Sequence, residues 1–155
     1  MKQIIPILLI LFFLNSCKKV EFSNTAQVSF ISFTPNTCEA NNLNNCKPIL
    51  KFHLQDANGD FGETTTSSSN LFFIMLNEAG DTISNSQFPF PSMSITNQKN
   101  MDVDVDFAIP NYIIQNLGGG VGPRTDIYKL KFYVKDFEGN RSNTESGGDF
   151  NYFIP

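Results

Sequence analysis

The side chains best suited to chemistry are carboxylates and amides gathered in two short, similar turns. They are Asp56, Asn58, Asp60, Asp136, Glu138 and Asn140. Oxygen donors of this kind are the ligands that calcium prefers. If the two turns meet, their clustered carboxylates repel one another, and a shared cation would relieve that repulsion. No cofactor is required by the sequence, and calcium is the candidate.

Turn chemistry alone is the alternative interpretation of the same residues. Asp56, Asn58 and Asp60 match the first positions of an EF-hand loop, but Phe61 stands where that loop needs glycine. Ser67 likewise replaces its bidentate glutamate. In the alternative, Asn-Gly supplies a positive φ and the Asp side chains accept hydrogen bonds from nearby backbone amides.

Two further groups of polar residues favour ordinary surface roles. Asp102, Asp104 and Asp106 alternate along one strand, here called the Asp stripe, at a spacing of about 7 Å, too wide for one ion. An outward-facing charged strand that deters edge pairing explains the stripe better. His53 is the only histidine and stands between two apolar residues without a nucleophile signature nearby. We therefore expect no enzyme; a carboxylate-dependent hydrolase, the weaker alternative, would need two acids facing each other across a cleft.

The two turns follow two copies of one strand. Residues 49–62 and 129–142 align at a constant offset, with Phe52 matched to Phe132, Asp56 to Asp136 and Gly59 to Gly139. Each copy alternates apolar and polar residues before its turn, which is typical of a strand with one buried face. An internal repeat of this kind favours an all-β sandwich in which the copies belong to opposite sheets.

The rest of the chain fits the same fold class, because short strands alternate with frequent turn signals. Strands are expected at residues 27–34 (with a bulge), 48–56, 71–77 (covered on both faces), 82–88, 93–96, 101–107, 126–136 and 150–154. About seven strands predict an immunoglobulin-like antiparallel β-sandwich over residues 27–155. In that topology the repeated strands are second and sixth, so their turns share one end. Strand 101–107 then pairs with 48–56, and the Asp stripe faces Lys51 and His53.

The first residues have the layout of a leader peptide. Lys2 precedes an apolar run from Ile4 to Leu14 that would span about 16 Å as a helix, half of a bilayer core. Residues 1–16 therefore predict an export signal. Cys17 follows, and residues 17–26 form a polar tether in which Lys18 and Lys19 suit lipid headgroups.

Three motifs resemble those of known bacterial envelope proteins. Leu14-Asn15-Ser16-Cys17 resembles a lipobox, which implies cleavage before Cys17 and lipidation of that residue. Residues 136–142 look like the D-x-x-G-N-x-S hairpin of bacterial immunoglobulin-like domains, and residues 56–62 resemble the D-x-x-G-D-x-G element of small Bacteroidetes-type lipoproteins of unknown function. The resemblance implies an outer-membrane lipoprotein of the cell envelope, of unassigned leaflet, with an immunoglobulin-like domain.

The resemblance brings no activity with it. It leaves a non-enzymatic binding or structural role in an outer-membrane assembly, with an envelope protein or a glycan as partner and the membrane held through the lipid. A calcium-stabilised adhesion module or a carbohydrate-binding module is the alternative within the same setting.

Cysteine count and charge agree with export. With Cys17 lipidated, Cys38 and Cys46 remain as one pair, and an oxidising compartment predicts a disulfide between them. Zinc is the rival use of that pair, although we expect no second cysteine pair and no histidine within reach of it. The chain carries 11 basic and 15 acidic residues, and one basic residue, Lys2, belongs to the leader. A net negative charge disfavours nucleic acid as a partner.

Overall fold

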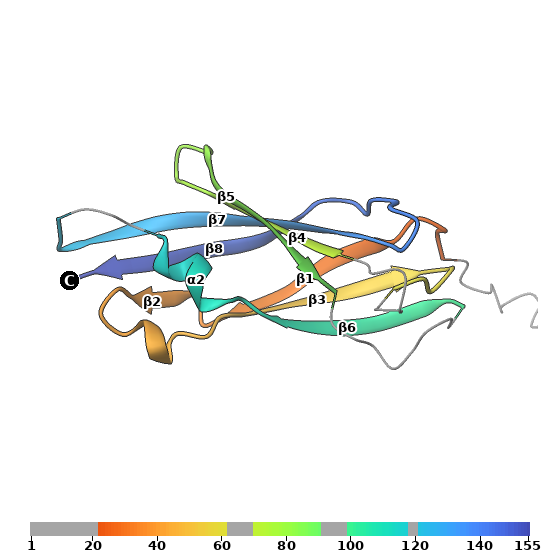
Figure 1. Ribbon diagram of the computed structural model, residues 1–155, viewed down its shortest axis with the longest axis horizontal. Helices are drawn as coiled ribbons and strands as arrows, with labels where there is room; N and C mark the ends of the chain where they lie inside the picture. Colours follow the sequence, from red (N-terminus) through yellow and green to blue (C-terminus); the bar gives the residue numbers. More distant parts are fainter. Residues whose placement is uncertain (1–21, 62–69, 91–98, 118–120) are drawn as a thin grey trace, which may run out of the picture.

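The computed structural model describes residues 22–61, 70–90, 99–117 and 121–155, and most of these form two facing sheets (Figure 1). One sheet has the strand order β1-β3-β6 and the other β2-β8-β7-β4-β5. The elements are β1 (Gln27–Thr34), β2 (Thr37–Glu39), η2 (Leu43–Asn45), β3 (Ile49–Asp56), β4 (Asn70–Leu76), β5 (Thr82–Pro89), β6 (Met101–Ala108), α2 (Asn111–Gln115), β7 (Arg124–Lys135) and β8 (Glu145–Ile154). The order is that of an immunoglobulin-like sandwich, which confirms the predicted fold class.

The two copies of the internal repeat are inner strands of opposite sheets, as predicted. β3 lies between β1 and β6, and β7 lies between β8 and β4. The equivalent residues Phe52 and Phe132 meet across the core with ring centroids 5.1 Å apart. Alternation places Leu50 and Leu54 beside Phe52 on the buried face of β3. Each fully buried side chain of this size contributes about 1.5–3 kcal/mol of transfer free energy, so the repeat supplies much of the core.

The partner of β6 is also as predicted. β6 pairs antiparallel with β3, placing Asp106 opposite Lys51 and Asp104 opposite His53. The lysines of β7 lie on the other sheet, so the Asp stripe does not face them. The expected bulge in the first strand lies between Phe30 and Ser32.

Several elements differ from the sequence prediction. β2 runs parallel to β8 over three residues, so the sandwich is not wholly antiparallel. β4 is fully buried on one face only, whereas burial of both faces was expected. On its outer face Phe72 stacks on Tyr133 at a centroid distance of 4.6 Å and stays partly exposed. β8 begins at Glu145 rather than at 150, because Gly147 has no side chain to collide with Leu130; an added Cβ would lie 3.1 Å from the Leu130 Cβ. The strand expected at 93–96 lies outside the described residues.

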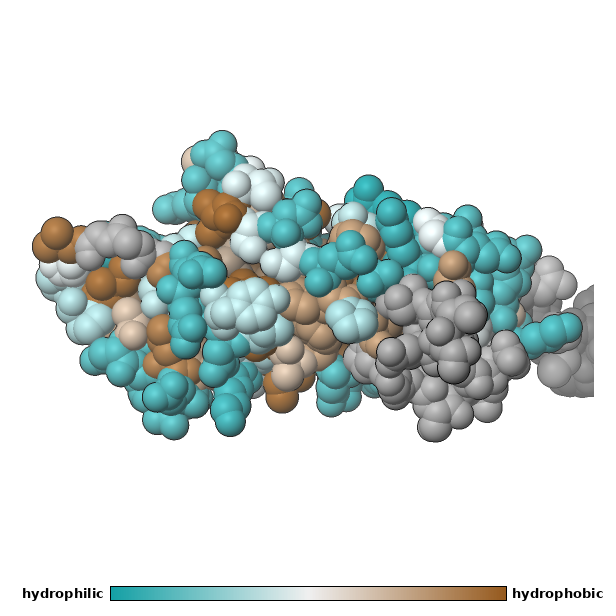
Figure 2. All heavy atoms as spheres, viewed as in Figure 1, coloured by the Kyte–Doolittle hydropathy of each residue, from teal (hydrophilic) through white to brown (hydrophobic). Residues whose placement is uncertain are grey.

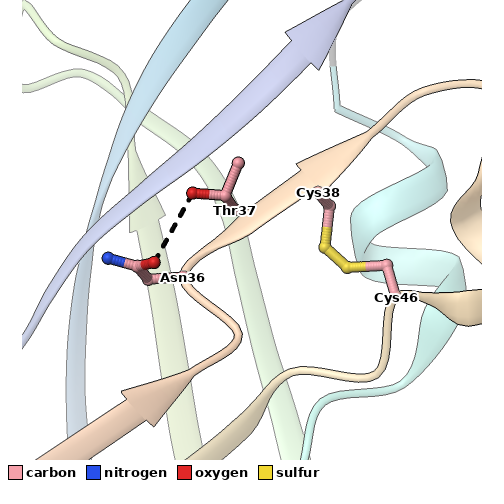
Figure 3. Close-up of a disulfide and its surroundings, with 4 residues drawn as sticks. All are labelled: Asn36, Thr37, Cys38 and Cys46. Atoms are coloured by element: carbon pink, nitrogen blue, oxygen red, sulfur yellow. Dashed lines mark hydrogen bonds between the residues drawn. A yellow bond between two sulfur atoms is a disulfide. The ribbon is translucent and has the colours of Figure 1, made fainter.

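Cys38 and Cys46 form the predicted disulfide, with their Cα atoms 5.7 Å apart. Figure 3 shows the bond joining β2 to the segment that leads into β3, next to α2. Both cysteines are buried. This pairing rules out the rival use of these thiolates as zinc ligands.

On the face shown in Figure 2, hydrophilic residues lie along the upper and lower borders and apolar residues lie through the middle. Among the residues that the structure describes, no helix is both long and apolar enough to cross a bilayer.

Candidate functional site

The turns after β3 and β7 meet at one end of the sandwich, as predicted. The Phe137 N–H donates to the Asp60 carbonyl oxygen at 3.1 Å, which joins the two turns directly. We call residues 56–61 and 136–141 the tip. In Figure 1 the tip lies at the right-hand end, and α2 and the C-terminus lie towards the left-hand end.

The second turn satisfies its own buried carboxylate. Asp136 is 2% exposed and accepts from the Asn140 backbone N–H at 2.7 Å and from the Asn140 side-chain amide at 2.9 Å. Gly139 allows the tight reversal with φ = 86°. Each oxygen of Asp136 therefore has a hydrogen-bond donor, which offsets the cost of burying the charge.

The first turn does not satisfy its own buried carboxylate. Asp56 is fully buried, and its Oδ2 accepts from the backbone N–H of Gly59 at 2.5 Å and more weakly from that of Asp60 at 3.4 Å. The residue equivalent to Asn140 is Asp60, which has no amide to donate. Asp56 Oδ1 and Asp60 Oδ1 are consequently buried without a hydrogen-bond partner in the described part of the chain. Two carboxylates thus share a site that supplies donors for one of them.

This crowding changes the acidity of the site. Burial, contact with Asp56 and the charge of Asp136 together raise the pKa of Asp60 to about 6. The nearby Arg141 does not lie on the carboxylates; its guanidinium stacks on the Tyr133 ring at 3.8 Å and donates to the Thr144 hydroxyl. Turn chemistry, the alternative interpretation of the sequence, accounts for Asp136 and leaves the Asp56–Asp60 pair unexplained.

The structure therefore does not gather all six predicted calcium ligands in one place. The structure brings Asp56, Asp60 and Asp136 together, while Asn58 and Glu138 are exposed on the outside of their turns. Asn140 is committed to Asp136. Within the described ranges no three His, Cys, Asp or Glu side chains are arranged to hold a metal ion by themselves. A cation at the tip would also need backbone carbonyl oxygens and water, which calcium accepts readily.

The Asp stripe forms an exposed ionic network across β3 and β6. His53 Nε2 lies 2.6 Å from Asp102 and its Nδ1 lies 2.8 Å from Asp104. Lys51 lies 3.7 Å from Asp104 and 3.8 Å from Asp106. The bond from His53 lowers the pKa of Asp104. The predicted role of the stripe and of His53 as surface residues agrees with this arrangement.

The opposite end of the molecule carries a groove that the sequence did not reveal. A cavity of about 410 Å³ there is lined by residues of β7, by Asn116 and Leu117 beyond α2, and by the β4–β5 turn. A second cavity of about 190 Å³ continues between α2 and β5 and shares Ile83, Asn116 and Leu117 with the first. We call the two together the distal groove. Figure 2 shows apolar side chains among polar ones on this face.

An ion pair provides the polar wall of the distal groove. Arg124 donates to both Asp126 oxygens, from Nε at 2.8 Å and from Nη2 at 3.1 Å, and this bond raises the pKa of Arg124. Burial raises the pKa of Tyr128. Ile83 and Tyr112, which are 44% and 54% exposed, line the second cavity. The i, i+2 spacing of Arg124 and Asp126 on one strand face was the available sequence signal, but nothing local indicated the facing elements.

Comparison with known proteins leaves the function open. No protein-family model and no curated protein matches the chain. Among the solved structures with low similarity is a Pseudomonas fluorescens alkylpurine DNA glycosylase AlkC bound to DNA containing an abasic site analog (11% identity, TM-score 0.40, 92% of this chain and 33% of that one). Another is the Northeast Structural Genomics Consortium target SoR45 (12% identity, TM-score 0.25, 90% of this chain and 91% of that one). This chain thus spans a third of the glycosylase chain.

Proposed function

We propose that the chain is a lipid-anchored, non-enzymatic module of the cell envelope, held in the outer membrane through Cys17. The observation that carries the proposal is the apolar leader ending in Leu14-Asn15-Ser16-Cys17. The Cys38–Cys46 disulfide supports it, because such bonds persist in exported proteins. The two sheets supply a rigid body that displays its loops at two ends.

The tether supports a definite orientation of this module. The Ala57 N–H donates to the Ser23 carbonyl oxygen at 3.0 Å, so the chain joins the domain at the tip. About six extended residues separate Ser23 from Cys17, a reach of roughly 20 Å. In the anchored protein the tip therefore faces the bilayer, and the distal groove points away from it.

The distal groove is the surface that this proposal assigns to the partner. It combines a neutralised Arg124–Asp126 pair with the exposed Tyr112 and Ile83. Pockets with a few fixed polar groups beside apolar ones are typical of specific recognition. An uncharged segment of an envelope protein or a neutral glycan suits a wall whose positive charge is already paired.

A carboxylate-dependent hydrolase is less well supported. The two acids of such an enzyme should face each other across a cleft, and the pKa of one of them should be raised. The acids of this kind, Asp56 and Asp60, lie beneath the turns of the tip and line neither cavity of the distal groove.

Membrane fractionation of the expressed full chain tests the proposal. The wild-type protein should partition into detergent, and mass spectrometry should find acyl chains on an N-terminal Cys17. Cys17→Ser should abolish acylation and leave an uncleaved precursor or a detergent-insensitive protein. Ser16→Ala is the matched control, because a small residue still precedes the cysteine, and it should remain lipidated. A wild-type mature protein that begins elsewhere and lacks lipid would overturn the proposal.

A further inference from the structure

The internal repeat gives the tip a built-in comparison. Asp136 and Asp56 occupy equivalent positions, each buried at the start of its turn. In the second turn the residue four positions later is Asn140, and its amide completes the bonding of Asp136. In the first turn that residue is Asp60, a second acid instead of a donor. One difference in the repeat therefore converts a self-satisfied carboxylate into a pair of carboxylates.

The pair has acceptor oxygens without donors. Asp56 Oδ1 and Asp60 Oδ1 are both buried and have no hydrogen-bond partner among the described residues. Asp56 has no exposed surface at all. A buried ionised carboxylate requires compensation by donors or by a positive charge. The backbone amides of Gly59 and Asp60 reach only the other Asp56 oxygen.

The described cations around the tip have other partners. Arg141 stacks on Tyr133 and Lys135 lies over the Phe72 ring at 5.2 Å, both on the outer face of the larger sheet. The lysine and histidine of β3 pair with the Asp stripe. The compensation for Asp56 and Asp60 must therefore be either a proton shared between the two carboxyl groups or an ion small enough to enter between two turns already joined by the Phe137–Asp60 hydrogen bond.

We propose that Asp56 and Asp60 bind a divalent cation at the tip, with calcium as the ion whose preference for carboxylate and carbonyl oxygens they suit. The negative field of the neighbouring Asp136 adds to the attraction. Backbone carbonyls of the turns and water would complete a shell of 6–8 oxygen ligands, as calcium requires. The cation would tie the turn after β3 to the turn after β7 and so brace the end at which the tether enters. The site does not depend on lipidation and would exist in the unlipidated domain as well.

Thermal unfolding of the full chain in detergent at pH 7.5 tests the site, with calcium chloride compared against a chelator. Binding to the folded state alone increases the folding constant about a hundredfold when calcium exceeds Kd a hundredfold. We expect a higher Tm in calcium and one equivalent of binding by isothermal titration calorimetry.

Asp60→Asn copies the arrangement of the second turn and is the decisive variant. It should fold, should be at least as stable as the wild type in chelator, and should lose the calcium response. Asp102→Asn removes an exposed aspartate of the stripe without touching the tip and should retain the full response.

Three results would overturn the proposal. The first is a wild-type Tm and titration heat that do not change in ~10 mM calcium chloride, a concentration well above the Kd of the weakest extracellular calcium modules. The second is an Asp60→Asn protein that keeps the calcium response. The third is an Asp102→Asn protein that loses it. Since Asp60→Asn is close to isosteric, it avoids the risk that Asp56→Ala would simply unfold the domain.

Discussion

The two ends of the sandwich are stabilised by different chemistry. At the tip, buried carboxylates hold two turns through backbone amides, and one pair of oxygens is left without donors. At the distal end, the Cys38–Cys46 bond joins β2 to the segment before β3, and Arg124 pairs with Asp126. The contacts of the distal end need no further partner, because the sulfurs are bonded covalently and the Arg124–Asp126 charges are paired. The unpaired carboxylate oxygens of the tip still need a proton or a cation. The tip is therefore the end whose stability should respond to pH and ions.

The largest effect should come from the distal end. Cys46→Ser opens a short loop and should lower the free energy of unfolding by about 2.5–3 kcal/mol in the chain-entropy model. Urea unfolding of the oxidised wild type and the variant measures the loss. The calcium response of the tip should survive in the variant; its disappearance would show that the two ends are coupled and would break the comparison.

The next largest effect should come from the satisfied turn of the tip. Asp136→Ala removes the acceptor of two Asn140 donors and should cost about 2 kcal/mol of unfolding free energy. Glu138→Ala, an exposed acid in the same turn, should change stability by less than about 0.5 kcal/mol. Equal losses in chemical denaturation would mean that charge, rather than buried hydrogen bonding, holds this turn.

The unsatisfied turn predicts a pH dependence. The folded-state pKa of Asp60, about 6, lies above its ordinary value, so the folded protein holds this proton more tightly than the unfolded chain. The stabilising contribution is complete below about pH 4 and is lost as the pH rises through about 6. Because Asp60 is only partly buried, the change should be on the order of 1 kcal/mol. Unfolding in chelator from pH 4 to 8 should show this loss, and Asp60→Asn should remove it.

The smallest effect should come from the Asp stripe, where aspartates are exposed and paired. The pKa of Asp104 is lowered mainly by His53, so its contribution is present above the ordinary aspartate pKa and is lost as the pH falls through the lower folded value. His53→Gln should raise the Asp104 pKa in an NMR titration while shifting Tm by no more than about 2 °C. A larger shift in Tm would mean that the Asp stripe contributes to stability about as much as the tip does.

The fold could be predicted where the decisive patterns are local. Alternation along residues 48–56 and the matching copy at 126–136 predicted both inner strands, and the repeat then placed their turns together. The partly exposed outer face of β4 could not be predicted, because an apolar run does not by itself show how far side chains of neighbouring strands, such as the Tyr133 ring, cover it. The early start of β8 depends on a close approach between Gly147 and Leu130, which no local pattern of residues 145–149 displays.

The candidate site was predictable in position but not in bonding. The shared turn motif identified Asp56, Asp60 and Asp136 as neighbours. Which carboxylate would be satisfied depended on a single difference, Asp60 against Asn140, whose meaning appears only when the donors are placed in space. The distal groove was missed because its walls come from β5, β7 and the α2 region, which are distant in sequence.

The hydrogen bond between Ala57 and Ser23 has a consequence for the ions that reach the tip. It shortens the free tether of the proposed anchored form to about six residues, so the tip stands within roughly 20 Å of the lipid headgroups. An anionic leaflet with a surface potential of about −30 mV would concentrate a divalent cation roughly tenfold at the surface, decaying over a Debye length of about 8 Å. Where the tip approaches within about one Debye length of the headgroups, the local calcium concentration would then depend on the lipid composition beneath it. At the full reach of roughly 20 Å, and in domains held on longer tethers, most of that enrichment would be lost.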